Sequence, residues 1–139
     1  MSTYYNTSND VLRARKAQTT ITASGAIGAN QAGEELNVAT DALVITLPKI
    51  ESSLIGMEYT IRNTGADGNN IITLSPNAAD GISGSIALAA SVFSASGVAN
   101  KDLVNTKATA ISGDFVTLKA VSLTKWFITA GIGIWASQA

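Results

Sequence analysis

The amino-acid sequence predicts a single all-β domain, an antiparallel β-sandwich or barrel, preceded by an extended N-terminal arm. Three observations indicate this class: the chain has 139 residues, apolar and polar residues alternate over short runs, and turn residues separate these runs. Roughly seven to nine such strands, with turns about ten residues apart, are typical of a sandwich or barrel. Because this length suits one domain, we assign residues 1–20 to the arm and residues 21–139 to the domain.

The arm differs from the rest of the chain in composition. Residues 1–10 are polar, and Tyr4 and Tyr5 are their large side chains. Three basic residues then follow closely: Arg13, Arg15 and Lys16. Together with Asp10 they give residues 1–20 a charge of +2 (three minus one), which leaves −3 for the remainder of a chain whose net charge is −1. A solvated terminus and a positive segment that docks on a partner both fit this pattern.

The first strands of the domain end at glycine or proline. Residues 19–23 alternate weakly before two glycines interrupt the pattern. Residues 42–48 are rich in β-branched and apolar side chains, and their closing proline stops the strand. Leu43, Ile45 and Leu47 share one face of this predicted strand, because strand side chains alternate between two faces.

Residues 56–62 give the clearest strand, with three apolar side chains on one face and three polar side chains on the other. This alternation is typical of a half-exposed strand in an antiparallel sheet. A loop rich in glycine and asparagine follows, and residues 71–75 resume as a strand that again ends at a proline. We expect the two strands to pair as a hairpin, with Asp67 and Gly68 near its tip.

The second half of the chain continues the pattern. Residues 82–90 are compatible with a strand or with a short helix, because their small side chains suit both. We expect further strands at residues 103–111, 115–121, 126–130 and 132–135. No internal repeat of about 20–50 residues is present, which argues against a solenoid.

The chain contains no cysteine and no histidine, and these absences limit its chemistry. They exclude a disulfide framework, a thiolate nucleophile, a cysteine or histidine metal site and a Ser-His-Asp triad. No apolar run approaches the about 18 residues that a membrane span needs, and the first residues lack the pattern of a secretory signal. We therefore expect a protein that is not an enzyme and that binds no cofactor, metal or membrane.

The charge content points toward assembly. Only 14% of the residues are charged, against about 25% in an average soluble protein, and a weakly charged surface favours association. The net charge of −1 gives no global attraction to nucleic acid. The three basic residues of the arm are too few for a nucleic-acid site, so we expect no nucleic-acid partner.

Two acidic stretches are candidates for a metal site or a catalytic site. Residues 67–70 look like part of a calcium loop, but they lack the alternating ligands and the closing carboxylate of an EF-hand, and turn chemistry explains them. Glu34 and Glu35 are adjacent carboxylates, and neighbouring strand residues point to opposite faces, which does not suit a pair of catalytic carboxylates. We interpret both stretches as loops.

The last predicted strands contain two tryptophans and two unusual glycines. Trp126 and Trp135 are typical of core packing, although an indole N–H also favours the rim of a core or an interface. Gly131 and Gly133 weaken a strand unless it bends or another backbone approaches it closely. Such an approach occurs around a symmetry axis between subunits, so we name these four residues as candidates for a subunit interface.

Five segments carry a resemblance to a known group of proteins. They are Ile55–Gly68, Ile71–Ile82, Gly113–Leu118, Trp126–Thr129 and Gly133–Trp135. Their sequences resemble head decoration (cement) proteins of tailed bacteriophages and are also similar to β-rich modules of phage tail fibres. The resemblance extends over residues 43–136 and does not include the arm.

The resemblance implies a jelly-roll or β-tulip type of fold and a structural role in the virion. It implies a homotrimer that binds the outer surface of the capsid and stabilises contacts between major capsid protein subunits, after synthesis in the cytoplasm of a bacterial host. No catalytic residues come with it. By our interpretation the capsid-binding residues are in the arm: Tyr4, Tyr5, Arg13, Arg15 and Lys16.

A different function remains open at this point, the receptor-binding or carbohydrate-binding tip of a tail fibre. That function needs exposed aromatic side chains in a groove, and four residues are available for it: Tyr4, Tyr5, Trp126 and Trp135. A hydrolase is a third hypothesis, but the sequence contains no recognisable set of catalytic residues for it.

Overall fold

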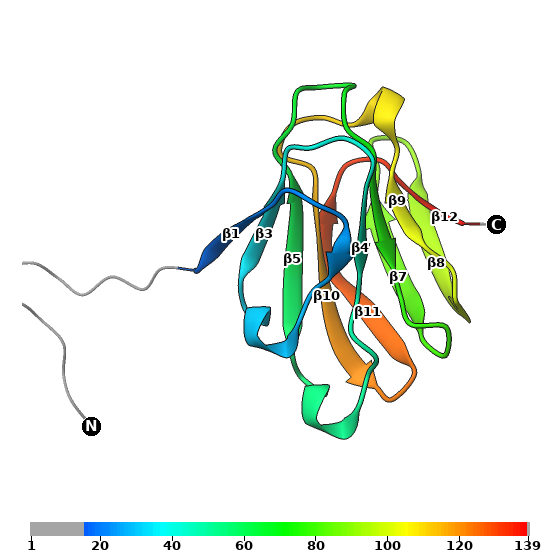
Figure 1. The fold of residues 1–139 in the computed structure, drawn as a ribbon. Helices are drawn as coiled ribbons and strands as arrows, with labels where there is room; N and C mark the ends of the chain where they lie inside the picture. The colour runs from blue at the N-terminus through cyan, green and yellow to red at the C-terminus, as the bar shows by residue number, and fades with distance from the viewer. Residues whose placement is uncertain (1–15, 139) are drawn as a thin grey trace, which may run out of the picture.

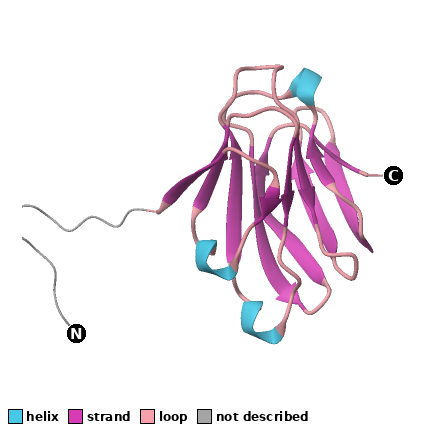
Figure 2. Cartoon of the chain, viewed as in Figure 1, coloured by secondary structure: helices cyan, strands magenta, loops and turns pink. Residues whose placement is uncertain are grey.

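A computed structural model describes residues 16–138 of the chain, and the regular structure in this range is mostly β-strand (Figure 1, Figure 2). The strands are β1 (Gln18–Ile21), β2 (Gly25–Ala26), β3 (Glu35–Val38), β4 (Leu43–Thr46), β5 (Glu58–Asn63), β6 (Ile72–Ser75), β7 (Gly81–Ala87), β8 (Val92–Ala99), β9 (Leu103–Asn105), β10 (Phe115–Ser122), β11 (Lys125–Ile132) and β12 (Trp135–Ser137). The 3₁₀ helices are η1 (Ala29–Gln31), η2 (Ser52–Leu54) and η3 (Lys107–Thr109). None of these helices has the length and apolar character of a membrane span. The prediction of an all-β fold is confirmed.

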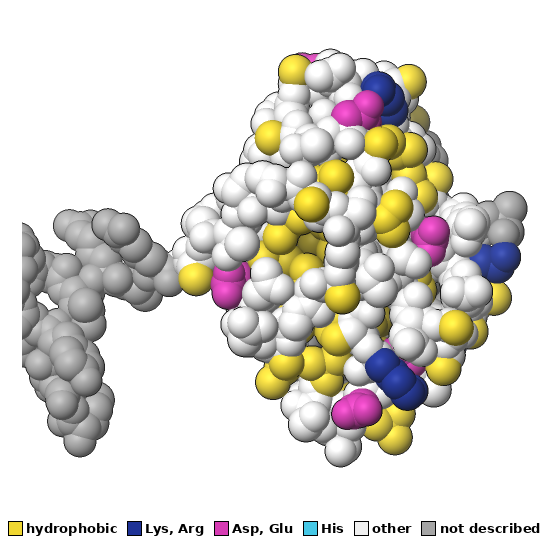
Figure 3. Space-filling model, viewed as in Figure 1, with side chains coloured by type: hydrophobic (Ala, Val, Ile, Leu, Met, Phe, Trp, Pro, Cys, Tyr) yellow, Lys and Arg dark blue, Asp and Glu magenta, His cyan; other side chains and the backbone are white. Residues whose placement is uncertain are grey.

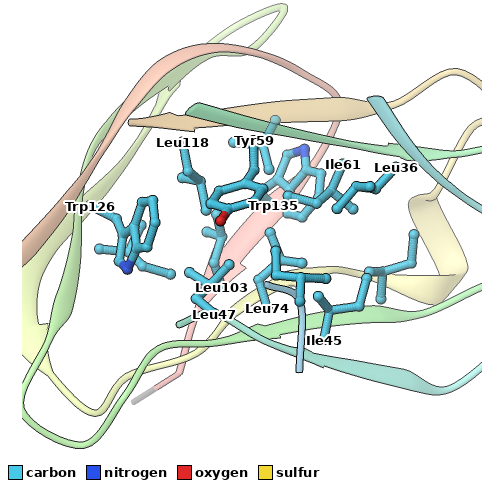
Figure 4. Close-up of a cluster of buried hydrophobic side chains, with 14 of the residues drawn as sticks. Leu36, Ile45, Leu47, Tyr59, Ile61, Leu74, Leu103, Leu118, Trp126 and Trp135 are labelled. Atoms are coloured by element: carbon cyan, nitrogen blue, oxygen red, sulfur yellow. The ribbon is translucent and has the colours of Figure 1, made fainter. Parts of the chain in front are cut away.

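The strands form two mixed sheets. The larger sheet has seven strands in the order β1-β3-β5-β10-β11-β7-β8, and the smaller sheet has five in the order β12-β9-β6-β4-β2. Side chains from both sheets meet in one hydrophobic core, which Figure 4 shows in close-up. Both sheets therefore bury one face against the other and leave the opposite face to solvent.

The expectation of an antiparallel domain is wrong for half of the strand pairs. Five pairs are parallel: β1 with β3, β3 with β5, β2 with β4, β4 with β6, and β7 with β11. The reason is that β1 to β6 alternate between the two sheets along the chain. Strands that are neighbours in one sheet are then two elements apart in sequence and run in the same direction.

The predicted hairpin of residues 56–62 and 71–75 is also wrong. β5 belongs to the seven-stranded sheet and β6 to the five-stranded sheet, so the loop between them crosses from one sheet to the other. Asp67 and Gly68 do lie in a turn, since Gly68 has a φ of 68° and the N–H of Asn69 donates to the carbonyl of Ala66 at 3.1 Å. Local turn chemistry identified the turn but not the strands that it joins.

The second half of the chain contains the true hairpins. β7 pairs antiparallel with β8, and β10 pairs antiparallel with β11. The ambiguous residues 82–90 are mostly strand, because β7 covers Gly81–Ala87. The strand expected at residues 103–111 is shorter than predicted, since β9 ends at Asn105 and η3 follows.

The core follows the alternation expected of strands. On β5 the side chains of Tyr59 and Ile61 are fully buried, and on β10 Val116 and Leu118 lie directly opposite Ile61 and Tyr59. The rings of Tyr59 and Trp126 meet edge to face, with their centroids 5.6 Å apart. Such aromatic pairs add about 0.5–1.5 kcal/mol beyond the area that they bury. These contacts fix β5, β10 and β11 as the centre of the larger sheet.

The arm is shorter than residues 1–20. β1 begins at Gln18 and pairs in parallel with β3 from the Gln18–Glu35 position onward. The backbone N–H of Glu35 also donates to the carbonyl of Ala17 at 2.8 Å. Residues 18–20 therefore belong to the edge of the seven-stranded sheet, because a short weakly alternating run becomes a strand when β3 offers it a free edge.

Candidate interaction surface

The acidic residues of the described chain serve structural contacts. Within residues 16–138, no three acidic, histidine or cysteine side chains cluster as a metal site would require. Asp67 accepts a hydrogen bond from the N–H of Ser112 at 2.8 Å and thereby joins two loops. Glu34 accepts a hydrogen bond from Thr19, whereas Glu35 forms an ion pair with Arg62. The two adjacent glutamates therefore have separate partners and do not converge on one site.

The two tryptophans are buried in the core of this chain, which corrects their assignment to a subunit interface. Trp126 has no exposed surface and Trp135 is 2% exposed. The indole N–H of Trp135 donates to the carbonyl of Ile132 at 3.1 Å. Because both side chains are enclosed by their own domain, they offer no contact area to another subunit.

Contacts within the chain also explain why glycine is present at positions 131 and 133. A Cβ at Gly131 would come within 3.0 Å of the side chain of Ile86. A Cβ at Gly133 would lie 2.2 Å from the carboxyl carbon of Asp114, and the φ of Gly133 is 104°. The close approach expected from the sequence is therefore real, but it involves buried side chains and not the backbone of a second subunit.

Most of the predicted arm contacts lie outside the described residues. They are Tyr4, Tyr5, Arg13 and Arg15. Lys16 is described, and its Nζ donates to Oγ1 of Thr60 at 2.9 Å. The Thr60 hydroxyl also bonds to the hydroxyl of Thr117 at 2.9 Å, across β5 and β10. Lys16 thus fastens the end of the arm to the outer face of the larger sheet.

The outer face of the larger sheet divides into a charged half and a neutral half. In the charged half, Arg62 pairs with Glu35, donates from Nη1 to the carbonyl of Gly113 at 2.8 Å, and lies 4.7 Å from the ring centroid of Phe115. Glu58 and Lys119 are directly opposite each other on β5 and β10. This half therefore contains one ion pair, Arg62 with Glu35, and places two further opposite charges, Glu58 and Lys119, on neighbouring strands.

The neutral half spans β11, β7 and β8, and we call it the neutral face. Its outward side chains include Phe127, Ala130, Ile132, Ser83, Ser85, Ser94 and Ser96, with Lys125 at one end beside Gly97 and Ser83. Lys125 is its one charged side chain among these, and the exposed fraction reaches 37% for Phe127 and 60% for Ile132. Large exposed apolar side chains among small neutral ones are typical of a surface that binds another protein.

A second apolar cluster lies at one end of the sheets, and we call it the apolar end. It consists of Ile55, Val121 and Leu123, all of which are exposed. The N–H of Gly56 donates to the carbonyl of Ala120 at 2.7 Å, which brings the loop after η2 beside the turn between β10 and β11.

Charged side chains are few and scattered on the face of the molecule that Figure 3 presents.

The sequence analysis selected a buried residue of β11 as a candidate for surface contact. It singled out Trp126, whereas the exposed partner on the same strand is the next residue, Phe127. The signal for this was present, since alternation places consecutive residues on opposite faces. What the sequence did not reveal is that Ser83, Ser85, Ser94 and Ser96 lie beside Phe127, because that depends on the pairing of β11 with β7 and of β7 with β8.

Comparison of the chain with known protein families and with curated proteins found no match.

Proposed function

We propose that this chain is a non-enzymatic structural protein that assembles with copies of itself and coats the outer surface of a tailed-bacteriophage capsid. In this proposal it forms a homotrimer and holds neighbouring major capsid protein subunits together. Its domain is a β-sandwich, which the two sheets and their shared core support. The observation that carries the proposal is the neutral face, together with the low charge of the whole chain.

The neutral face supports self-association because its only outward charge is Lys125 at one end, so little charge has to be desolvated when an identical copy binds. Phe127 and Ile132 supply large apolar side chains, and the serines around them are small enough to let another surface approach closely. Aromatic side chains in a neutral setting are enriched at the centre of interfaces, where charged residues are depleted. We therefore assign the subunit interface to the neutral face.

Attachment to the capsid is assigned to the basic arm and to the apolar end. We assign Arg13 and Arg15, which lie outside the described residues, to this contact, whereas Lys16 donates a hydrogen bond to Thr60. A ligand that binds only the assembled capsid stabilises the assembled state by mass action. Three copies joined in a trimer bind with avidity, because each arm is held near its own site on the capsid.

The receptor-binding alternative is not supported by the structure as described. It requires exposed aromatic side chains in a groove, and Trp126 and Trp135 are both buried. Of the four residues named for this role, Tyr4 and Tyr5 are left, and they lie outside the described residues; Phe127 is exposed, but it lies on an open sheet face among small side chains. We therefore do not propose it.

Two measurements test the proposed function. Sedimentation equilibrium of the purified chain is expected to give three times the 14.2-kDa mass of one chain. Co-sedimentation with purified phage heads is expected to show binding, which weakens when Arg13→Gln and Arg15→Gln are combined. Lys49→Gln, at an exposed lysine of the domain, is the matched control and retains binding. A chain that stays monomeric and does not co-sediment with heads would refute the proposal.

A further inference from the structure

β8 is the last strand at one edge of the seven-stranded sheet, and β12 of the smaller sheet lies beside it without pairing with it. β8 has eight residues, none of them charged and none of them proline. In the part of the chain that the structure describes, no strand pairs with its outer side. Proteins usually protect such an edge with charged side chains, proline or a very short strand. The opposite edge of the sheet does follow this rule, because β1 has four residues and Lys16 lies next to it.

The side chains of β8 leave its outer edge accessible. Val92 is 63% exposed and Val98 is 54% exposed, and Ser94 and Ser96 are also exposed. The pairing with β7 shifts register between the Ser83–Ser96 and Gly81–Ala99 positions, so β8 contains an extra residue near Gly97, whose φ is 75°. This bulge limits the regular edge to residues 92–96, a length that suits a short added strand.

We propose that residues 1–9 of one copy add to β8 of a neighbouring copy as an eighth strand of its larger sheet. This inference rests on the self-association in the proposed function and specifies how the copies are joined. It assigns Tyr4 and Tyr5 to the neighbouring subunit and leaves Arg13 and Arg15 to the capsid. Addition of an extended segment to a free sheet edge is an established mode of protein recognition.

The chemistry of residues 1–9 matches that of β8. No Asp, Glu, Lys or Arg side chain occurs in residues 1–9 or in β8, so pairing them desolvates no charged side chain. Threonine and tyrosine, which are common in strands, make up four of these nine residues: Thr3, Tyr4, Tyr5 and Thr7. Large tyrosine side chains in an added strand have the exposed valines of β8 as apolar neighbours.

The geometry favours a neighbouring copy over the same copy. Strands lie about 4.8 Å apart, so the six spacings from β1 to β8 amount to about 29 Å. The seven Cα–Cα steps from Asn9 to Lys16 span at most about 25 Å. A chain whose pairing with β8 extends as far as Asn9 is therefore too short to reach its own β8 across the sheet, so the β8 strand that it pairs with is that of another copy. Contacts from one edge of a subunit to the opposite edge of the next form a closed trimeric ring when the rotation between successive copies is one third of a turn.

Cysteine cross-linking tests this proposal directly, because the chain has no native cysteine. A Tyr5→Cys chain is mixed with a Ser94→Cys chain that carries a tag of different mass, and the mixture is oxidised. We expect a disulfide-linked pair of the two different chains, which disappears on reduction. The matched control replaces Ser94→Cys by Thr46→Cys, at an exposed position of β4 in the other sheet, and gives no such pair above background.

Deletion of residues 1–9 provides a second test that does not alter the described domain. We expect loss of the trimer by sedimentation, with the urea unfolding curve of the monomer retained. If the truncated chain still forms the trimer, or if Ser94→Cys and Thr46→Cys cross-link equally, the strand-exchange proposal is wrong while the proposed function stands. If the full chain itself stays monomeric and ignores phage heads, both proposals are wrong.

Discussion

Asn63 on β5 donates a hydrogen bond from Nδ2 to Oδ1 of Asn105 on β9 at 2.8 Å, and this bond joins the two sheets inside the protein. Nδ2 of Asn105 in turn donates to Oδ2 of Asp114 and to the carbonyl of Ile134, both at 3.1 Å. All three side chains of this network are nearly inaccessible to solvent. A buried network whose members satisfy one another fixes the relative position of the elements that carry them.

Replacing Asn105→Ala is expected to lower the free energy of unfolding by about 2–4 kcal/mol. The change removes the acceptor of the Asn63 Nδ2 group and one hydrogen bond each from the Asp114 carboxylate and the Ile134 carbonyl, which still accept from the N–H groups of Ile111 and Thr106. Urea unfolding followed by tryptophan fluorescence measures the loss. The control is Asn37→Ala, which removes an exposed bond to Gln18 and is expected to change the free energy by about 0.5 kcal/mol or less. Equal effects of the two substitutions would contradict the role given to the network.

Gly133→Ala is expected to destabilise the fold by about 2–4 kcal/mol, because the new methyl group combines a positive φ with a clash. Its Cβ would lie 2.2 Å from the carboxyl carbon of Asp114. Gly25→Ala is the matched control, since a Cβ there has nothing within 4 Å, and it should stay within about 1 kcal/mol of the parent chain. Thermal unfolding distinguishes the two, and a neutral Gly133→Ala would show that the Asp114 loop moves freely.

The stability of the fold is expected to decrease in alkaline solution because of Tyr59. Burial raises the pKa of the Tyr59 phenol above the ordinary value of 10.0 for tyrosine, and its hydroxyl donates to the carbonyl of Gly28 at 2.9 Å. The stabilisation that Tyr59 contributes is therefore fully present below the pKa that its phenol has in the unfolded chain. It is lost as the pH rises toward the higher pKa of the folded chain, because the unfolded chain ionises first. Unfolding curves measured across this pH range should show a smaller decrease for Tyr59→Phe than for the parent chain.

The pKa of Asp41 is expected to depend on Lys107. The hydrogen bond and ion pair with the Lys107 ammonium, and then the N–H of Ile71, hold the pKa of Asp41 below the ordinary value of 3.8 for aspartate. Lys107→Met should raise that pKa toward the ordinary value, as measured by NMR titration of the carboxyl group. Because the folded pKa is lowered, the associated stabilisation is present above the unfolded pKa and is lost as the pH falls through the folded pKa. An unchanged Asp41 titration in Lys107→Met would refute this cause.

Substitutions at the neighbouring residues Phe127 and Trp126 are expected to have different effects, the first on assembly and the second on the stability of the fold. Phe127→Ser should abolish self-association and leave the unfolding transition of the monomer nearly unchanged. Trp126→Ala should instead cost about 3–5 kcal/mol of stability, because it opens a cavity in the core. Val44→Ser is the control for assembly, since Val44 is 41% exposed on the smaller sheet. Sedimentation velocity gives the assembly state. Loss of assembly in Val44→Ser would contradict the assignment of the subunit interface to the neutral face.

The sequence by itself determined which residues share a face of a strand. The burial of Tyr59 and Ile61, and of Leu43 and Ile45, follows from their period-two spacing, because consecutive strand residues point to opposite sides. It also determined several turns, including the one at Gly68, because glycine takes a positive φ without a steric penalty. These features depend only on contacts between residues near one another in the chain.

The tertiary structure decided which strands are neighbours and which of the two faces meets the core. β5 pairs with β3 and β10, whose residues lie far from it in sequence, and no local pattern identifies those partners. For the same reason the sequence did not separate the buried Trp126 from the exposed Phe127, nor bring Asn63 to Asn105. Pairing between distant segments depends on the burial that the complete arrangement achieves, so it is a property of the whole chain and of no single segment.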